Sequence, residues 1–206
     1  YGDEIACVGQ SSCKACSAGY YQDEATGFAK CKGCMPGTYN DEVGAVVGSM
    51  CIPCGKGNYS DEESATSPSD CKTCAEGTYT PRSTGSSSCS SCPKGTYNSE
   101  VGAEDATHCQ KCDVGKYGEE SGAKSATSCL DCTIGQFGDE RGFPSITSCK
   151  NCVAGQYGTE NGASFCTACL PGTSSTKVGA ISMKSCALCH VGQYGAESGQ
   201  SACVPC

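Results

Sequence analysis

The stretch Cys112-Asp-Val-Gly-Lys-Tyr-Gly-Glu-Glu-Ser-Gly-Ala-Lys-Ser-Ala-Thr-Ser-Cys129 decides the fold class. The stretch that follows it reads Cys132-Thr-Ile-Gly-Gln-Phe-Gly-Asp-Glu-Arg-Gly-Phe-Pro-Ser-Ile-Thr-Ser-Cys149. Both have the pattern C-x-x-G-x-[YF]-x-x-E-x-G, followed by a Ser/Thr-rich segment and C-x-x-C. Self-similarity at such a short, fixed period is typical of repeat proteins.

The repeat extends over the whole chain. Apart from Cys7, every cysteine belongs to a C-x-x-C pair, and the pairs begin at residues 13, 31, 51, 71, 89, 109, 129, 149, 166, 186 and 203. We therefore expect residues 1–206 to form one continuous array of about eleven repeats of about 19 residues. In this frame the first repeat (residues 1–16) is truncated and the last ends in mid-repeat at residue 206.

The composition supports a disulfide scaffold. Cysteine accounts for 23 of 206 residues, tryptophan is absent, and large aliphatic residues are too scattered to build an ordinary core. The net charge of −8 argues against nucleic-acid binding, and no apolar run is long enough to span a membrane. We expect small disulfide-rich tandem repeats that form an elongated rod of stacked loops, with short β-hairpins and almost no helix.

The fixed positions of the repeat suggest how each loop folds. The glycine three residues after the second cysteine suits a tight turn with positive φ, and a second glycine marks a second turn. The aromatic residue, such as Tyr117 or Phe137, is the only bulky apolar group in most copies, and we expect it to lie across the nearest disulfide. Ser174 replaces it in one copy, which we expect to be the loosest.

The cysteine order suggests the pairing. Neighbouring cysteines of one C-x-x-C rarely bond each other, because the geometry is strained. The simplest scheme joins the second cysteine of one pair to the first of the next, which gives Cys16–Cys31, Cys34–Cys51, Cys54–Cys71, Cys74–Cys89, Cys92–Cys109, Cys112–Cys129, Cys132–Cys149, Cys152–Cys166, Cys169–Cys186 and Cys189–Cys203.

The odd cysteine count leaves the ends open. Either Cys7 pairs with Cys13 and Cys206 has no partner in the chain, or Cys13 pairs with a cysteine upstream and Cys7 is spare. Both alternatives predict an excerpt from a longer array, or a subunit whose Cys206 bonds Cys7 or Cys13 of another copy.

The run Cys92-Pro-Lys-Gly-Thr-Tyr97, with the pair Cys109 and Cys112 after it, resembles the ephrin-receptor-like cysteine-rich repeat. It is also similar to the single-disulfide module of tumour-necrosis-factor receptors, in which one bridge closes the same loop. The resemblance covers essentially the whole chain. It implies an extracellular protein of the kind common on the surfaces of protists and algae.

Metal binding is an alternative use of these residues. C-x-x-C pairs can hold zinc, with His108 or His190 completing a site, but structural disulfides explain eleven evenly spaced pairs more simply. Aligned glutamates three residues after the aromatic position could bind Ca²⁺, although a solvated face is the simpler interpretation. These glutamates are Glu24, Glu42, Glu62, Glu100, Glu120, Glu140, Glu160 and Glu197.

Two further surface features concern partners. The same loop acids could face lysines beside the cysteine pairs of a neighbouring molecule and so favour lateral association; these lysines are Lys14, Lys30, Lys32, Lys72, Lys111 and Lys150. Asn58-Tyr59-Ser60 is an N-glycosylation sequon, and residues 83–88 and 173–176 are candidate O-glycan segments or simply small loop residues.

The sequence contains no acid–base pair, activated nucleophile or phosphate loop, so we predict no enzyme activity and no cofactor. We predict a secreted or cell-surface structural protein, because only an oxidising compartment sustains so many disulfides. Its role would be a stalk, wall component or filament subunit, with further repeats, copies of itself and glycans as partners. The alternative is a ligand-binding ectodomain of a surface receptor or adhesin.

Overall fold

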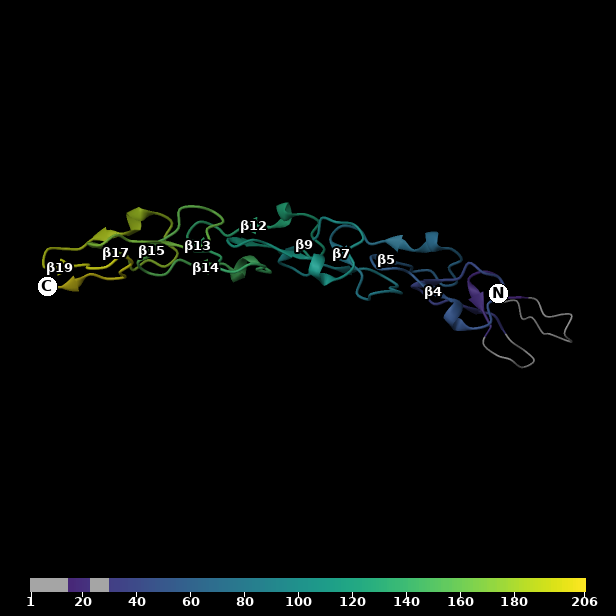
Figure 1. Cartoon of the computed structure of the whole chain (residues 1–206). Coiled ribbons are helices and arrows are strands. Elements are labelled where there is room, and N and C mark those ends of the chain that lie inside the picture. Colours follow the sequence, from purple (N-terminus) through teal and green to yellow (C-terminus); the bar gives the residue numbers. More distant parts are fainter. Residues whose placement is uncertain (1–14, 23–29) are drawn as a thin grey trace. The chain divides into compact units, whose positions relative to one another are not determined.

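The computed structural model describes residues 15–22 and 30–206 of the chain. Within these residues the chain forms ten antiparallel two-stranded hairpins, and none of these residues is in an α-helix (Figure 1). We number the repeats 1 to 10 by their hairpins, which are β1(Tyr20–Tyr21) with β2(Lys32–Gly33), β3(Thr38–Tyr39) with β4(Ile52–Pro53), β5(Asn58–Tyr59) with β6(Lys72–Thr73), β7(Thr78–Tyr79) with β8(Ser90–Ser91), β9(Thr96–Tyr97) with β10(Gln110–Lys111), β11(Lys116–Tyr117) with β12(Leu130–Asp131), β13(Gln136–Phe137) with β14(Lys150–Asn151), β15(Gln156–Tyr157) with β16(Thr167–Ala168), β17(Thr173–Ser174) with β18(Ala187–Leu188), and β19(Gln193–Tyr194) with β20(Val204–Pro205). The expected fold class of small disulfide-rich tandem repeats with short hairpins and almost no helix is confirmed.

From Cys31 onwards, the two residues inside each C-x-x-C form the second strand of a hairpin. In repeat 6, Tyr117 pairs with Leu130 and Lys116 pairs with Asp131. The first strand carries the aromatic residue of the same repeat. These two residues therefore do more than connect successive loops, because their backbone hydrogen bonds to the first strand help to close each loop.

Each hairpin is closed by one disulfide. Ten bridges are present in the described residues, from Cys16–Cys31 to Cys189–Cys203, and they coincide with the ten loop-closing pairs suggested by the cysteine order. Cys206 is exposed and free. Cys7 and Cys13, and with them the suggested Cys7–Cys13 bridge, lie outside the described residues.

Loop length decides whether a repeat contains a 3-10 turn. The six repeats whose paired cysteines lie 17 residues apart each have one: η1(Gly48–Met50), η2(Pro68–Asp70), η3(Ala106–His108), η4(Ala126–Ser128), η5(Ile146–Ser148) and η6(Met183–Ser185). The separation is 15 residues for Cys74–Cys89 and 14 for Cys152–Cys166 and Cys189–Cys203, and these three loops have no such turn. Shortening the loop by two or three residues thus removes the turn.

Backbone hydrogen bonds join each repeat to the next. The Gly95 N–H of repeat 5 donates to the Gly118 carbonyl of repeat 6 at 2.8 Å, and the Gly118 N–H donates to the Phe143 carbonyl of repeat 7 at 2.9 Å. A third bond runs from the Gly142 N–H of repeat 7 to the Cys112 carbonyl of repeat 6, also at 2.9 Å. Equivalent bonds recur in the other repeats, so the peptide groups of each loop find partners in its neighbours.

A closer contact spans two repeats. Gly115 of repeat 6 has φ +77° and lies against the carbonyl group of Gly162 in repeat 8. A Cβ atom at Gly115 would come within 3.0 Å of that oxygen, so only glycine allows the two backbones to approach. The same two-repeat contact joins Gly37 to Gly85, Gly57 to Gly102, Gly95 to Gly142, Gly135 to Gly179, and Gly155 to Gly199.

The core is built from cystines and small residues. The second cysteine of most pairs is completely buried, as Cys34 and Cys132 are, and the residue after the second glycine is a buried alanine in several repeats, such as Ala45 and Ala103. Most of the repeat aromatics are only half-buried. The expected position across a disulfide is present at Tyr117, which packs with Phe143 against Cys132 and Cys149 of the following repeat.

Ser64 marks a strained position in repeat 3. It has φ +58° and occupies the place that glycine takes in the other repeats, for example Gly44 and Gly102. A left-handed conformation costs an ordinary residue about 1–2 kcal/mol, and glycine avoids this cost. Glycine also has more conformational entropy in the unfolded chain, which reduces the gain in stability by about 0.5–1 kcal/mol. We therefore expect Ser64→Gly to raise the free energy of unfolding by about 0.5–1 kcal/mol, measured by urea denaturation without reductant.

The control for this substitution is Glu63→Gly. It adds a glycine to the same loop without relieving strain, and should lower stability by about 0.5–1 kcal/mol. A loss of stability in Ser64→Gly would contradict the prediction and show that the contact of Ser64 Oγ with Gly33 outweighs the strain.

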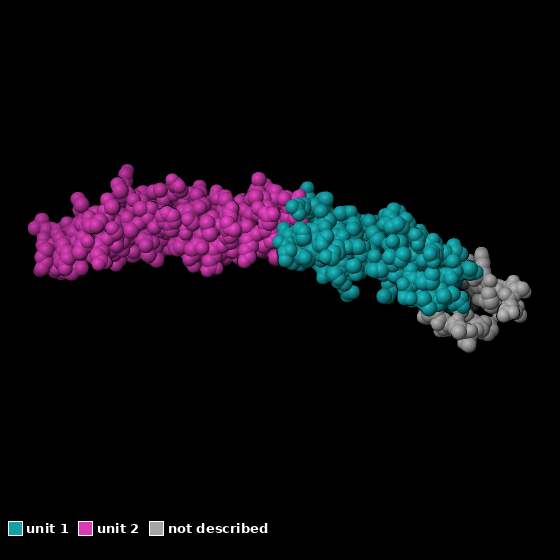
Figure 2. Space-filling view, viewed as in Figure 1, with its two compact units in different colours: residues 1–91, 100–108 teal, residues 92–99, 109–206 magenta. Residues whose placement is uncertain are grey.

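The chain divides into two compact units (Figure 2). One contains residues 1–91 and 100–108, and the other contains residues 92–99 and 109–206. The same hairpin, disulfide and inter-repeat hydrogen bonds occur in both. That the whole chain is one continuous array stays a prediction.

Candidate functional site

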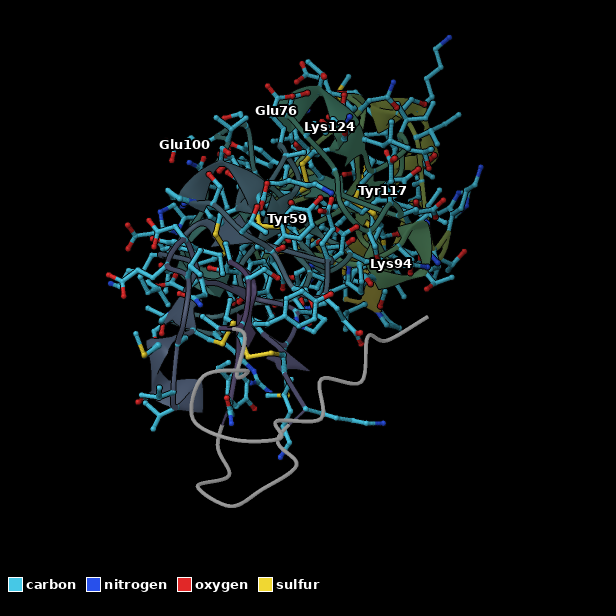
Figure 3. The ribbon with its side chains drawn as sticks, turned by 90° about the vertical axis from the view of Figure 1, so that its right-hand side faces the viewer. Tyr59, Glu76, Lys94, Glu100, Tyr117 and Lys124 are labelled. Carbon is cyan, nitrogen blue, oxygen red and sulfur yellow. A yellow bond between two sulfur atoms is a disulfide. The ribbon has the colours of Figure 1, made fainter. Side chains whose placement is uncertain are left out.

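The aligned glutamates lie on the surface. Those that the structure describes are all exposed: Glu42, Glu62, Glu100, Glu120, Glu140, Glu160 and Glu197; Glu24 lies outside the described residues. Figure 3 shows Glu76 and Glu100 at the edge of the molecule and Tyr59 further in. Within residues 15–22 and 30–206, no three Asp, Glu, His or Cys side chains gather as a metal site, so the calcium hypothesis gains no support from geometry.

Some of the lysines beside the cysteine pairs form ion pairs within their own loops. Lys72 Nζ lies 2.8 Å from Asp61 Oδ1 and 3.1 Å from Glu62 Oε1. Lys150 Nζ lies 2.7 Å from Asp139 Oδ2. These two lysines thus use acids of their own repeat, where the sequence had suggested acids of a neighbouring molecule.

These pairs shift the pKa of both partners. The hydrogen bond from Lys72 holds the pKa of Asp61 below its usual range, and the bonds to Asp61 and Glu62 raise the pKa of Lys72. Lys150 lowers the pKa of Asp139 in the same way, and its own pKa is raised. The groups are solvent-exposed, so the pairs orient the loop surface more than they stabilise the fold.

The pH dependence of stability follows from these directions. An aspartate whose folded pKa is lowered stabilises the fold above its unfolded pKa of about 3.9, and this contribution disappears as the pH falls through the folded value. A lysine whose folded pKa is raised stabilises below about 10.4, and its contribution disappears as the pH rises through the folded value. We therefore expect constant stability between about pH 5 and 9, with losses outside that window.

NMR titration of the Asp61 carboxyl group tests this directly. Its midpoint should lie below the ordinary value and return to it in Lys72→Met, whereas the Asp139 midpoint should not change in that variant. An ordinary Asp61 midpoint in the wild-type protein would contradict the ion pair.

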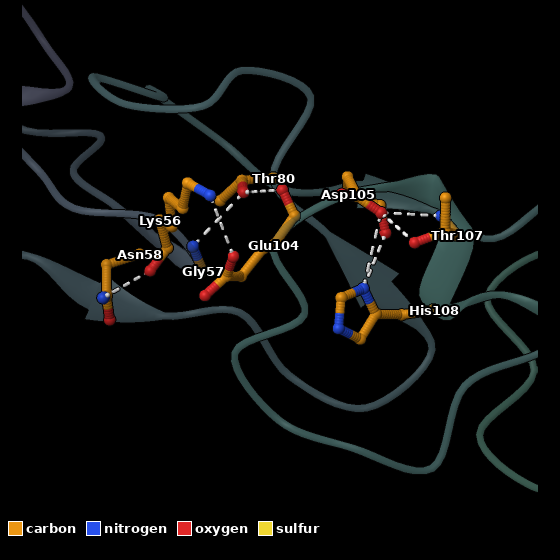
Figure 4. A network of polar contacts seen from close by, with 8 residues as sticks. All are labelled: Lys56, Gly57, Asn58, Thr80, Glu104, Asp105, Thr107 and His108. Carbon is orange, nitrogen blue, oxygen red and sulfur yellow. Dashed lines mark hydrogen bonds and ion pairs between the residues drawn. The ribbon is translucent and has the colours of Figure 1, made fainter.

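A second polar network connects three repeats of the first unit (Figure 4). Thr80 Oγ1 of repeat 4 accepts a hydrogen bond from the Gly57 N–H of repeat 3 at 3.3 Å and donates to the Glu104 carbonyl of repeat 5 at 2.9 Å. The Glu104 carboxylate lies 3.2 Å from Lys56 Nζ. The network helps to hold successive repeats together. The equivalent N–H of Gly37 donates to a backbone carbonyl, that of Ser60, and the Thr80 hydroxyl takes the place of such a carbonyl for Gly57.

The histidines do not complete a zinc site in the described part of the chain. His108 Nδ1 lies 3.5 Å from Asp105 Oδ1, and the same carboxylate accepts hydrogen bonds from Thr107 (Figure 4). The cysteines beside the two histidines, Cys109 and Cys189, are both in disulfides. Their sulfur atoms are thus unavailable as thiolate ligands.

The sequon asparagine is half-buried in strand β5. Its amide donates to the Lys56 carbonyl at 3.1 Å and accepts from Thr73 Oγ1 at 3.0 Å, while Ser60 of the same sequon is completely buried. Glycosylation of Asn58 remains a prediction. In the O-glycan segments Ser86 and Ser175 are buried, which leaves the exposed hydroxyls, such as Thr176, as candidates there.

One surface feature was not anticipated from the sequence. A hollow of about 350 Å³ lies in repeat 8, after strand β15. Its signals in the sequence are the short spacing between Cys152 and Cys166 and the aromatic Phe165 directly before a cysteine. The hollow is lined by Gly158, Thr159, Glu160, Gly162, Ala163, Ser164, Phe165 and Thr167.

Comparison with known families agrees with this repeat geometry. A family model described as tyrosine-protein kinase ephrin type A/B receptor-like matches residues 4–51, 23–71, 64–109, 77–129 and 143–186. The chain belongs to the ephrin-receptor-like repeat family. A search of curated proteins finds no match.

Ephrin-receptor-like repeats are non-catalytic, disulfide-rich modules of extracellular domains. The ten disulfides of this chain fit that setting, because oxidising compartments sustain them. In the part of the ephrin-receptor-like chain that the structure describes, no helix is long and apolar enough to cross a membrane.

Proposed function

We propose that the chain is a structural component of a cell surface: a disulfide-linked rod that serves as a stalk, wall component or filament subunit. The observation that carries this proposal is the uniform connection between repeats. The same backbone bonds join successive repeats, and the same glycine contacts join every second one. Such contacts carry load between repeats and place no special chemistry in any one of them.

The disulfides would make the array resistant to extension. Fully extended, residues 16–203 would span about 640 Å, but with ten loops closed by disulfides the span is limited to about 150 Å. The limit holds because each bridge keeps its two Cα atoms 5.6–5.8 Å apart. A stalk or filament built this way lengthens little under load until a bridge is reduced.

Single-molecule stretching of the oxidised chain tests the mechanical part of the proposal. We expect a contour length near 150 Å between handles at the two ends of this segment, and about 640 Å after reduction. The matched measurement is small-angle scattering, where the rod should give a radius of gyration well above the roughly 17 Å of a compact 206-residue domain.

The scattering also separates the proposal from the alternative. A radius of gyration near 17 Å, with no self-association over a concentration series in sedimentation, would overturn the structural role and favour a compact ligand-binding ectodomain. A larger radius together with end-to-end or lateral assembly would support a filament subunit.

A further inference from the structure

Repeat 8 combines a short loop with an aromatic residue directly before the cysteine that closes it. Its bonded cysteines are 14 residues apart, as in repeat 10, its loop has no 3-10 turn, and Phe165 directly precedes Cys166, the second cysteine of the bridge. Repeat 2 has Met50 there, and the other repeats have a small or polar residue: Lys30, Asp70, Ser88, His108, Ser128, Ser148, Ser185 and Ala202. The Phe165 side chain is 73% exposed, so it does not serve the core of its own repeat.

The hollow lies in this loop, and Phe165 is one of its lining residues. Ala163 is only half-buried, whereas its counterparts Ala123 and Ala180 are buried. The volume of about 350 Å³ lies within the range of small-ligand sites. Repeat 8 therefore presents an exposed aromatic ring beside a hollow large enough for a small ligand.

The lining has the chemistry of a site for an uncharged polar ligand. Thr159, Ser164 and Thr167 contribute hydroxyls that both donate and accept hydrogen bonds, and Glu160 contributes a carboxylate acceptor. No lysine or arginine lines the hollow, which disfavours phosphate, sulfate or carboxylate ligands. A pyranose ring combines a hydroxyl-rich edge with an apolar C–H face, and that face suits stacking on an aromatic ring.

We propose that the hollow of repeat 8 binds a neutral saccharide, with Phe165 as the stacking platform and Glu160 and the hydroxyl side chains as hydrogen-bond partners. This site is additional to the proposed structural role and does not depend on it. Because the lining offers only a few polar side chains, we expect an affinity in the millimolar range, and any tight attachment would come from several copies binding together.

Repeat 10 shows that the aromatic ring is not needed for the fold. Its loop also spans 14 residues between Cys189 and Cys203, it also lacks a 3-10 turn, and it has Ala202 where repeat 8 has Phe165. Phe165→Ala thus gives repeat 8 the residue that repeat 10, with a loop of the same length, has at this position. We expect this variant to keep its disulfides and its amide spectrum.

The test is saturation-transfer NMR on the intact oxidised chain, with cellobiose, mannobiose and N,N′-diacetylchitobiose as probes at about 10 mM. We expect transfer to the C–H protons of at least one probe, shifts in the Phe165 ring signals, and at least tenfold weaker binding in Phe165→Ala. The matched control is Leu170→Ala, which removes an apolar side chain that is 63% exposed and outside the hollow, and should bind as the wild-type protein does.

Choline serves as the competing probe, since a cation could also stack on Phe165 beside Glu160. Glu160→Gln should keep saccharide binding within a few-fold, because the amide oxygen still accepts a hydrogen bond, but would abolish binding of a cation. No binding of any of the three sugars, equal binding by Phe165→Ala, or binding of choline alone would each overturn the proposal.

Discussion

Full reduction of the disulfides is expected to unfold the repeats. Each bridge closes a loop of 14–17 residues and should contribute about 3 kcal/mol by constraining the unfolded chain. Ten such contributions exceed the roughly 5–15 kcal/mol by which a domain is usually stable. The remaining core of alanines and half-buried aromatics is too small to replace them.

The measurement is amide NMR dispersion together with small-angle scattering, before and after reduction and alkylation. Dispersion should collapse, and the radius of gyration should approach the roughly 49 Å of an unfolded chain of this length. The control is alkylation without reductant, which reaches the exposed thiol of Cys206 and should leave the spectrum otherwise unchanged. Retained dispersion in the fully reduced protein would show that the backbone bonds between repeats are sufficient by themselves.

Gly115→Ala should be among the most destabilising single substitutions outside the cysteines. The left-handed backbone at φ +77° costs an alanine about 1–2 kcal/mol, and the collision of its Cβ with the Gly162 carbonyl adds about 1–3 kcal/mol. We expect a loss of about 3 kcal/mol in the free energy of unfolding, measured by urea denaturation without reductant. Faster exchange of the Cys132 amide, which bonds to the Gly115 carbonyl, should locate the damage.

The matched control for Gly115→Ala is Gly172→Ala. Gly172 has nearly the same backbone conformation, φ +80°, but apart from its own atoms and those of its two chain neighbours no heavy atom lies within 4 Å of the position that its Cβ would take. Its alanine variant should lose only the conformational part, about 1–2 kcal/mol. Equal losses at the two positions would show that the close approach of the backbones two repeats apart contributes nothing.

The local features of each repeat were predictable from sequence. The spacing of the cysteines and the turn glycines limits each loop to a short hairpin, and Gly37 and Gly115 adopt the expected positive φ. The low apolar content and the lack of helical periodicity argued correctly against helices and a large core. These inferences succeeded because they depend on neighbours within one loop.

The features that depend on other repeats were not predictable. Nothing in the segment around Gly115 indicates that its backbone lies against Gly162, which is 47 residues later in the chain. The aromatic residues looked like the core because they are the largest apolar side chains, yet most of the buried positions are occupied by cystines, alanines and small polar residues, and Tyr117 is buried where most other repeat aromatics are not. The hollow beside Phe165 is lined by residues of repeat 8 alone, and the short cysteine spacing did not indicate where their side chains would lie.

The contacts between repeats are made mainly by peptide groups and glycines, and this has a consequence for how such chains can diverge. A substitution at most loop positions changes the outer surface without changing the N–H and carbonyl groups that join the repeats. Cysteine spacing and a few glycines therefore specify the scaffold, and the remaining positions can vary independently from one copy to the next. Repeat 8 shows this combination: its Phe165 side chain is exposed on the surface, while its disulfide and its backbone bonds match those of the other repeats.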